Sequence, residues 1–224
     1  MPEIRRIPAE DARLDACATV IAESLRQALA GTAGRVSFMV SGGRTPRGVL
    51  TRLAAHDLPW PRIDVFASDE RLVPPSDPAS TEGMVREALS GCAPEIRYHG
   101  FGPSTEPGAA LAQWKAALGG LRWPVAAAFL GIGEDAHTAS LFPGRPECRR
   151  GDDWAFAVPQ TDPHPHARLT LGRAALLRAE RTVAVVQGAA KRAALSRALA
   201  PGADCQDTPA ALFRDMPEMI ILTD

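Results

Sequence analysis

Apolar positions recur along the chain with two different spacings. Between residues 9 and 30 they return every three or four positions, which is the spacing of one face of an α-helix. These residues are Leu14, Cys17, Ile21, Leu25 and Ala28. Residues 36–40, 63–67 and 125–130 instead form short, mostly apolar runs without alternation. Such runs are typical of strands that are buried on both faces, so the pattern predicts helices that alternate with buried strands.

The same two patterns continue to the C-terminus. We predict further helices at 46–55, 80–89, 106–118 and 188–200, and further strands at 169–171, 182–186 and 219–222. The segment 145–165 is rich in Pro, Asp and Arg and is predicted to form loops. Repeated strand–helix–strand units favour an α/β fold with a mostly parallel sheet and helices on both faces. We expect a single domain over residues 1–224.

Composition narrows the classes of function. Hydrophobic residues make up 46% of the chain and charged residues 23%, which is ordinary for a globular protein. The formal net charge of -1 gives no basic excess, so we expect no nucleic-acid partner. No apolar run approaches the ~20 residues that span a bilayer, and the N-terminus has no apolar signal core, which predicts a cytoplasmic protein without a membrane partner. The scattered cysteines, Cys17, Cys92, Cys148 and Cys205, are expected to be free thiols.

The first candidate loop follows the strand predicted at 36–40. In open parallel sheets, ligands bind beyond the carboxyl ends of the strands. The loop reads Ser41, Gly42, Gly43, Arg44 and Thr45 and leads into a predicted helix. Its glycines let backbone N–H groups approach a ligand, the helix N-terminus attracts anions, and the Arg44 and Thr45 side chains add donors. We predict a phosphate-binding loop here, with an ordinary strand-to-helix turn as the alternative.

Two acids and an arginine follow the strand predicted at 63–67, in the order Asp69, Glu70 and Arg71. An arginine fork matches phosphate oxygens in a bidentate way, and neighbouring carboxylates can orient the arginine or bind sugar hydroxyls. Asp69 and Arg71 are therefore candidate binding residues, although a solvated charge cluster would give the same pattern. Downstream, Ser80 and Thr81 are expected to cap a helix.

The candidate catalytic group is His137. It follows an apolar strand and a Gly-x-Gly turn, and Asp135 stands two residues before it. Histidine exchanges protons near neutral pH, and a nearby carboxylate can fix its tautomer and raise its basicity. We therefore predict that His137 and Asp135 act as a catalytic pair. Ala136 occupies the third place of an incomplete Gly-x-Gly-x-x-Gly pattern, and the first strand lacks that motif, so no dinucleotide site is expected.

Two further cations and a pair of histidines complete the candidate chemistry. Lys191 lies early in the predicted helix 188–200, and Arg168 lies beside the predicted strand 169–171. Each is a candidate contact for an anion, or else a surface residue. His164 and His166 could serve as metal ligands, but the prolines around them favour an exposed loop, and we predict no metal site.

Taken together, these motifs resemble the 6-phosphogluconolactonase family. The resemblance covers nearly the whole chain and is carried by the order and spacing of five segments. They are SGGRTP at 41–46, DERLVP at 69–74, GIGEDAHTASLFP at 131–143, PHARLTL at 165–171 and GAAK at 188–191. The resemblance implies a Rossmann-like fold shared with glucosamine-6-phosphate deaminases and hydrolysis of a sugar-phosphate lactone, 6-phospho-D-glucono-1,5-lactone, in the oxidative pentose phosphate pathway. It also implies that no cofactor is required.

For this reaction we expect a mechanism in which His137 deprotonates the water that attacks the lactone carbonyl and Asp135 orients the imidazole. Arg71, Arg168, Lys191 and the loop at 41–45 are the expected partners of the phosphate. Which cation contacts the phosphate and which the oxyanion stays open.

The sequence departs from the family pattern at two positions. Ala136 replaces a glycine, and alanine is strained if that position has a positive φ. Thr81 replaces the usual asparagine, so a sugar contact from that amide is lost or altered.

Three other functions are consistent with parts of the pattern. An isomerase or deaminase could share the fold, but such deaminases continue toward Asn-Glu-Pro where this chain has Ser-Leu-Phe-Pro at 140–143. A non-catalytic sugar-phosphate sensor would normally carry a DNA-binding segment, and no basic helix-turn-helix pattern flanks the core. A metal-dependent hydrolase is the third alternative.

Overall fold

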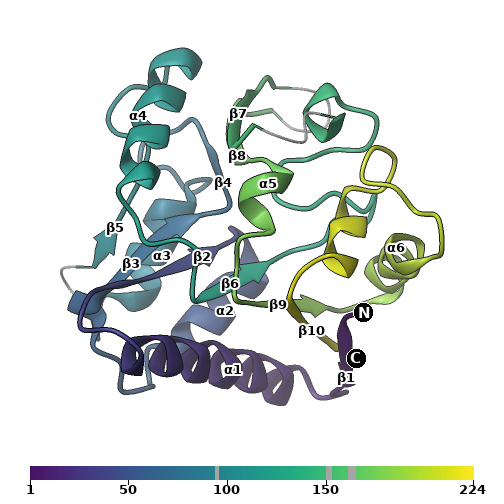
Figure 1. The fold of residues 1–224 in the computed structure, drawn as a ribbon, viewed down its shortest axis with the longest axis horizontal. Coiled ribbons are helices and arrows are strands. Elements are labelled where there is room, and N and C mark those ends of the chain that lie inside the picture. Colours follow the sequence, from purple (N-terminus) through teal and green to yellow (C-terminus); the bar gives the residue numbers. More distant parts are fainter. Residues whose placement is uncertain (94–95, 150–152, 161–164) are drawn as a thin grey trace.

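The computed structural model describes residues 1–93, 96–149, 153–160 and 165–224. Its centre is a seven-stranded sheet in the order β1-β10-β9-β6-β2-β3-β5 (Figure 1). The strands are β1 (Glu3–Arg6), β2 (Val36–Val40), β3 (Ile63–Ala67), β5 (Arg97–Tyr98), β6 (Ala127–Leu130), β9 (Arg181–Val186) and β10 (Glu218–Thr223). All pairings between these strands are parallel. The α/β fold and the mostly parallel sheet are therefore confirmed.

Helices cover both faces of this sheet. Successive side chains of a strand point to opposite sides, so each central strand contributes to a core on either face. In β2, Phe38 and Val40 belong to the core on one face, and Met39 belongs to the core on the other. The first core is completed by α1 (Glu10–Ala30), α2 (Arg44–Leu53) and α3 (Thr81–Leu89). The second is completed by α4 (Pro107–Gly119), α5 (Arg173–Leu176) and α6 (Ala189–Leu199). The wholly apolar strands predicted from the sequence are explained by this burial on both sides.

A small antiparallel sheet in the order β4-β8-β7 adjoins the second core. Its strands are β4 (Asp69–Arg71), β7 (Ala155–Val158) and β8 (Arg168–Leu171). The prediction of loops over 145–165 was wrong for β7, whose strand pairs along its whole length with β8. The pairing of β4 with β8 places Arg71 opposite Arg168 and Asp69 opposite Thr170. This sheet brings two segments that are far apart in the sequence to the same place.

The predicted boundaries hold to within about two residues at most elements. The strands β2 and β3 begin and end as expected, whereas α2 begins at Arg44, two residues before the expected start at Pro46. Ser80 is the N-cap of α3, and its hydroxyl accepts the backbone N–H of Gly83 at 3.1 Å, which confirms the predicted cap. Short 3-10 turns occupy Trp60–Arg62, Pro146–Arg149 and Pro209–Arg214. Among the described residues, no helix has the length and apolar character needed to cross a membrane.

Candidate active site

A cavity of about 340 Å³ opens where β2 and β6 end side by side. The chain leaves these two neighbouring strands toward opposite edges of the sheet, because β3 lies beyond β2 and β9 lies beyond β6. A switch point of this kind leaves a crevice at the carboxyl ends of the strands. Seven of the predicted site residues line this cavity. They are Ser41, Gly42, Asp69, Arg71, His137, Arg168 and Lys191.

The remaining predicted site residues lie beside the cavity. Asp135 contacts His137 directly. Gly43 turns the chain into α2 with φ 118°, and Arg44 and Thr45 form the first residues of that helix. These three residues are not part of the lining, and Arg44 is exposed. The structure therefore brings the first two residues of the loop to the cavity and leaves the last three outside its wall.

His137 and Asp135 form a hydrogen-bonded pair at the cavity. Nδ1 of His137 lies 2.6 Å from Oδ1 of Asp135, and the same oxygen accepts the backbone N–H of His137 at 3.1 Å. The side-chain bond from His137 lowers the pKa of Asp135 to about 2. Asp135 is therefore a carboxylate at neutral pH, and it favours the tautomer that leaves Nε2 of the imidazole without a proton. The ring also packs against Phe142, with 4.9 Å between the ring centroids.

The tight turn before His137 depends on Gly133. A Cβ atom on Gly133 would overlap Nδ1 of the imidazole and would lie 2.6 Å from Oδ1 of Asp135. The second glycine of the Gly-x-Gly turn therefore makes room for the His137–Asp135 pair, a role that was not assigned from the sequence. Ala136 has φ 72°, so this alanine does occupy the left-handed conformation that favours glycine.

A chain of hydrogen bonds at the cavity joins Ser41, Ser68, Asp69 and Ser140. The Ser68 hydroxyl donates to Asp69 at 3.1 Å, so Ser41 must be the donor in its 2.9 Å contact with Ser68. Ser140 donates to the other oxygen of Asp69 at 2.6 Å. Nη1 of Arg168 lies 3.6 Å from the same carboxylate oxygen. Asp69 therefore accepts hydrogen bonds from Ser68 and Ser140 and forms an ion pair with Arg168.

Arg71 and Gly42 are in close contact on the other side of the cavity. A Cβ atom on Gly42 would lie 2.9 Å from Nη1 of Arg71 and would also overlap the Thr81 hydroxyl. Gly42 is therefore required by the close approach of these two side chains. Nη1 of Arg71 also donates to the carbonyl of Ala79 at 3.3 Å.

From the sequence we expect the two carboxylates next to Arg71 to orient its guanidinium or to bind sugar hydroxyls, and the structure shows neither of them paired with that guanidinium. Asp69 pairs with Arg168 instead. Glu70 accepts backbone N–H groups from Arg71 and from the start of α3. The surroundings of Glu70 could not be predicted from the sequence. They depend on the pairing of β4 with β8 and on the packing of α3 against β4, and both are contacts between residues far apart in the sequence. Ser68 and Ser140 were missed for the same reason.

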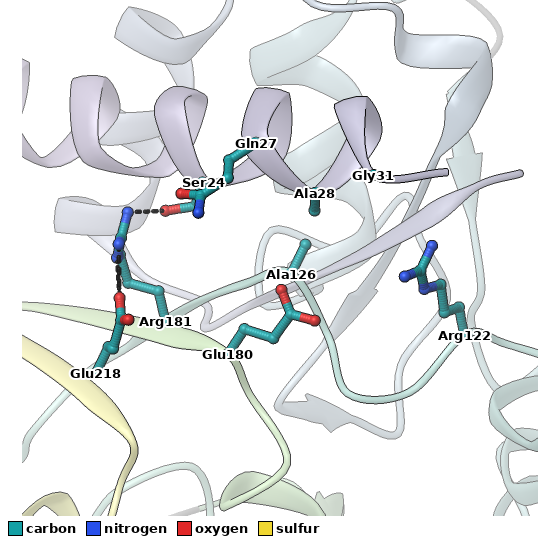
Figure 2. A pocket seen from close by; sticks show the side chains of 9 residues that line it. All are labelled: Ser24, Gln27, Ala28, Gly31, Arg122, Ala126, Glu180, Arg181 and Glu218. Atoms are coloured by element: carbon teal, nitrogen blue, oxygen red, sulfur yellow. Dashed lines mark hydrogen bonds and ion pairs between the residues drawn. The ribbon is translucent and has the colours of Figure 1, made fainter. Parts of the chain in front are cut away.

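A second cavity of about 280 Å³ lies at the amino-terminal ends of the strands, beneath the C-terminal part of α1 (Figure 2). At one end of it, Arg181 pairs with Glu218 at 2.6 Å and donates to the Ser24 hydroxyl at 3.2 Å. The described lining holds arginines and glutamates but no histidine. With its half-buried Arg181 already paired, this cavity offers less chemistry than the one at the carboxyl ends.

Metal ligands are not gathered anywhere in the described part of the chain, where no group of three or more His, Cys, Asp or Glu residues is placed to hold an ion. His164 lies outside the described residues. All four cysteines are free thiols.

Comparison with known proteins gives a consistent result. A family model described as "Glucosamine-6-phosphate isomerases/6-phosphogluconolactonase" matches residues 8–221. The chain is 39% identical over 193 residues to a 6-phosphogluconolactonase of Caulobacter vibrioides, covering 81% of each chain. It is 41% identical over 206 residues to one of Pseudomonas aeruginosa, covering 86% of this chain and 82% of the relative.

A crystal structure of a 6-phosphogluconolactonase from Shewanella baltica has the same fold. It superposes with a TM-score of 0.91 and 25% sequence identity, covering 100% of this chain and 98% of that one. With both its sequence and its architecture matched over most of their length, the chain belongs to the glucosamine-6-phosphate isomerase/6-phosphogluconolactonase family.

Proposed function

We propose that this protein is an enzyme that hydrolyses 6-phospho-D-glucono-1,5-lactone to 6-phospho-D-gluconate, a step of the oxidative pentose phosphate pathway. The observation that carries the proposal is the His137–Asp135 pair, which faces a cavity that also holds Arg71, Arg168 and Lys191. A proton acceptor and several cations are what hydrolysis of an anionic ester requires. The similarity to 6-phosphogluconolactonases supports the same reaction.

In this proposal His137 is the general base. Its Nε2 accepts a proton from a water molecule, and the hydroxide attacks the lactone carbonyl. Asp135 stays ionised, holds the ring through Nδ1 and stabilises the imidazolium that forms. His137 then returns the proton to the ring oxygen as the C–O bond of the tetrahedral intermediate breaks. Acid–base catalysis of this kind contributes about 10²–10⁴-fold to the rate.

Arg71 and Arg168 have different surroundings, which favour different roles. Arg71 contacts the Ser41–Gly42 turn, whose backbone can approach an anion closely, so we assign it to the phosphate. Arg168 lies 5.8 Å from the centroid of Phe142, the ring that packs against His137. We therefore assign Arg168 to the oxyanion that develops near the base. Lys191 completes the positive lining and has no separate assignment.

The other predictions about the protein's setting are part of the proposal. They are a single domain over residues 1–224, a cytoplasmic location, no cofactor and no nucleic-acid partner, and each rests on composition and motif rather than on the geometry of the site. The residues from Gly43 to Thr45 remain predicted phosphate contacts only through the backbone of their turn and the start of α2.

The direct test generates the lactone in solution by oxidation of glucose 6-phosphate and follows acid release. We expect the purified protein to accelerate release well above the spontaneous rate, and to do so in the presence of a chelator. Acid release at the spontaneous rate, with ammonia formed from glucosamine 6-phosphate, would instead indicate the deaminase reaction. Binding of 6-phosphogluconate without any turnover would indicate a sensor.

A further inference from the structure

Glu70 is a buried carboxylate that the proposed mechanism does not use. It is only 3% exposed and lies between Asp69 and Arg71 in β4. Because side chains alternate along a strand, Asp69 and Arg71 line the cavity while Glu70 points to the other side. A buried carboxylate costs free energy unless it is well bonded, so its partners indicate its role.

The carboxylate binds the N-terminus of α3. Oε1 accepts the backbone N–H of Arg71 at 2.9 Å and that of Thr81 at 2.8 Å. Oε2 accepts the backbone N–H of Glu82 at 2.7 Å, and the Ser80 hydroxyl lies 3.4 Å away. The bonds from Thr81 and Glu82 lie at the positive end of the α3 dipole, which favours a carboxylate there. Glu70 therefore joins β4 to α3, which are separated by the nine loop residues 72–80.

The hydrogen bond that holds the Arg71 guanidinium passes through this connection. Nη1 of Arg71 donates to the carbonyl of Ala79, which immediately precedes the N-cap of α3. Thr81, the first residue of α3, also packs closely against Gly42, since a Cβ atom on Gly42 would overlap its hydroxyl. A shift of α3 relative to β4 would therefore move the guanidinium away from the Ser41–Gly42 turn.

The charged groups around Glu70 leave it dependent on those N–H donors. Asp69 faces the cavity, and Glu82 is paired with Arg86 at 2.8 Å. Tyr98 of β5 approaches from the sheet, where burial and the nearby carboxylates Glu70 and Glu82 raise the pKa of its phenol. The helix N-terminus and the backbone of Arg71 are thus the groups that hold the carboxylate in place.

We propose that Glu70 is a positioning residue for phosphate recognition, which holds the Arg71 guanidinium against the Ser41–Gly42 turn by joining β4 to α3. This inference rests on the proposed function, because it requires that Arg71 contacts the substrate phosphate. The proposal predicts an effect on substrate binding without a comparable effect on the chemical step. Loss of the carboxylate should weaken binding of the phosphorylated lactone and leave the His137–Asp135 pair, on a different strand end, unchanged.

The experiment compares Glu70→Gln with Glu106→Gln. Glu106 is a matched control, since its carboxylate accepts the N–H groups of Gly108 and Ala109 at 2.9 and 2.6 Å at the start of α4, away from the cavity. Steady-state kinetics are measured for 6-phosphogluconolactone and for unphosphorylated glucono-1,5-lactone. Glutamine keeps the shape and one acceptor oxygen, so the variant should fold, and circular dichroism and the melting temperature check this.

We expect Glu70→Gln to raise KM for the phosphorylated lactone by about tenfold or more, with kcat changed less than about twofold. The kcat/KM for the unphosphorylated lactone and both parameters of Glu106→Gln should stay close to those of the unmodified protein. Equal losses with both lactones, or a KM no higher than that of Glu106→Gln, would overturn the positioning role.

Arg71→Ala separates this inference from the proposed function. If Arg71→Ala raises KM for the phosphorylated lactone and Glu70→Gln does not, the positioning role fails while the phosphate assignment stands. If Arg71→Ala leaves KM unchanged, the phosphate assignment itself fails, and the positioning role fails with it.

Discussion

At the scale of single residues, the site depends on how closely an imidazole and a carboxylate approach a glycine. His137 and Asp135 are only two positions apart, and their 2.6 Å contact folds the side chains back over Gly133. Any side chain at Gly133 would displace His137 and Asp135 from their present positions. The local sequence thus supplies the base, the group that orients it and the space that both require.

The variant Asp135→Asn should reveal the role of Asp135. The pKa of Asp135 is about 2, so this side chain is a carboxylate at neutral pH. An amide at this position no longer favours the tautomer of His137 that leaves Nε2 free to accept a proton, so we expect kcat to fall at least about tenfold. Steady-state kinetics measure this effect, and a kcat close to that of the unmodified protein would contradict the assignment.

Ala136 shows how a departure from the family pattern can be tolerated. Its φ of 72° costs about 1–2 kcal/mol relative to ordinary backbone. Its methyl group is buried, with 1% of the residue exposed, which contributes about 0.8 kcal/mol. Glycine would also add about 0.5–1 kcal/mol of backbone entropy cost on folding. These opposing effects nearly cancel.

Ala136→Gly should accordingly change the free energy of unfolding by no more than about 1 kcal/mol. We also expect kcat to remain within about threefold, because the turn already has the conformation that glycine prefers. Urea denaturation and steady-state kinetics measure the two effects. A large gain of stability together with a large gain of activity would show that alanine distorts this turn.

At the scale of secondary-structure elements, the burial of Glu70 between β4 and α3 makes stability depend on pH. Burial raises the pKa of Glu70 from 4.5 to about 7. Between these values the folded protein binds a proton that the unfolded chain releases, so the contribution of Glu70 to stability is fully present below about pH 4.5 and is lost as the pH rises through 7. The contribution is about 3 kcal/mol over that range.

Glu70→Gln removes this titration, so the decrease in unfolding free energy between about pH 4.5 and about pH 8 should be smaller than in the unmodified protein by an amount of that order. Glu106→Gln should change the pH dependence of the unfolding free energy in the opposite direction. Helix N–H groups lower the pKa of Glu106, so its stabilising effect is lost as the pH falls. Denaturant unfolding at several pH values measures both. Identical pH slopes in the unmodified protein and Glu70→Gln would contradict the account.

The secondary-structure elements differ in how well the sequence predicts them. Long helices and buried strands have a strong local pattern, so β2, β3 and α1 were located almost to the residue. β4 and β7 have only three and four residues, and both pair with β8, which lies far along the chain from β4 and follows β7 after an irregular segment. No local periodicity encodes such a partner.

At the scale of the whole molecule, the sheet order assembles the site from segments that span residues 41 to 191. Looking at the residues that follow the strands was sufficient to find Ser41, Arg71, His137 and Lys191, which line one cavity. It could not predict that Asp69 pairs with Arg168, because that contact follows from the register of β4 against β8. It also included Gly43, Arg44 and Thr45, which lie beyond the cavity wall because α2 begins early.

The most direct test of the account is the kcat of His137→Ala for 6-phosphogluconolactone, with 6-phosphogluconate binding measured on the same preparation. The account predicts that kcat falls by about 10²-fold or more, while the product still binds through Arg71 and the Ser41–Gly42 turn with little change in Kd. A kcat close to that of the unmodified protein would contradict the role of His137 as general base.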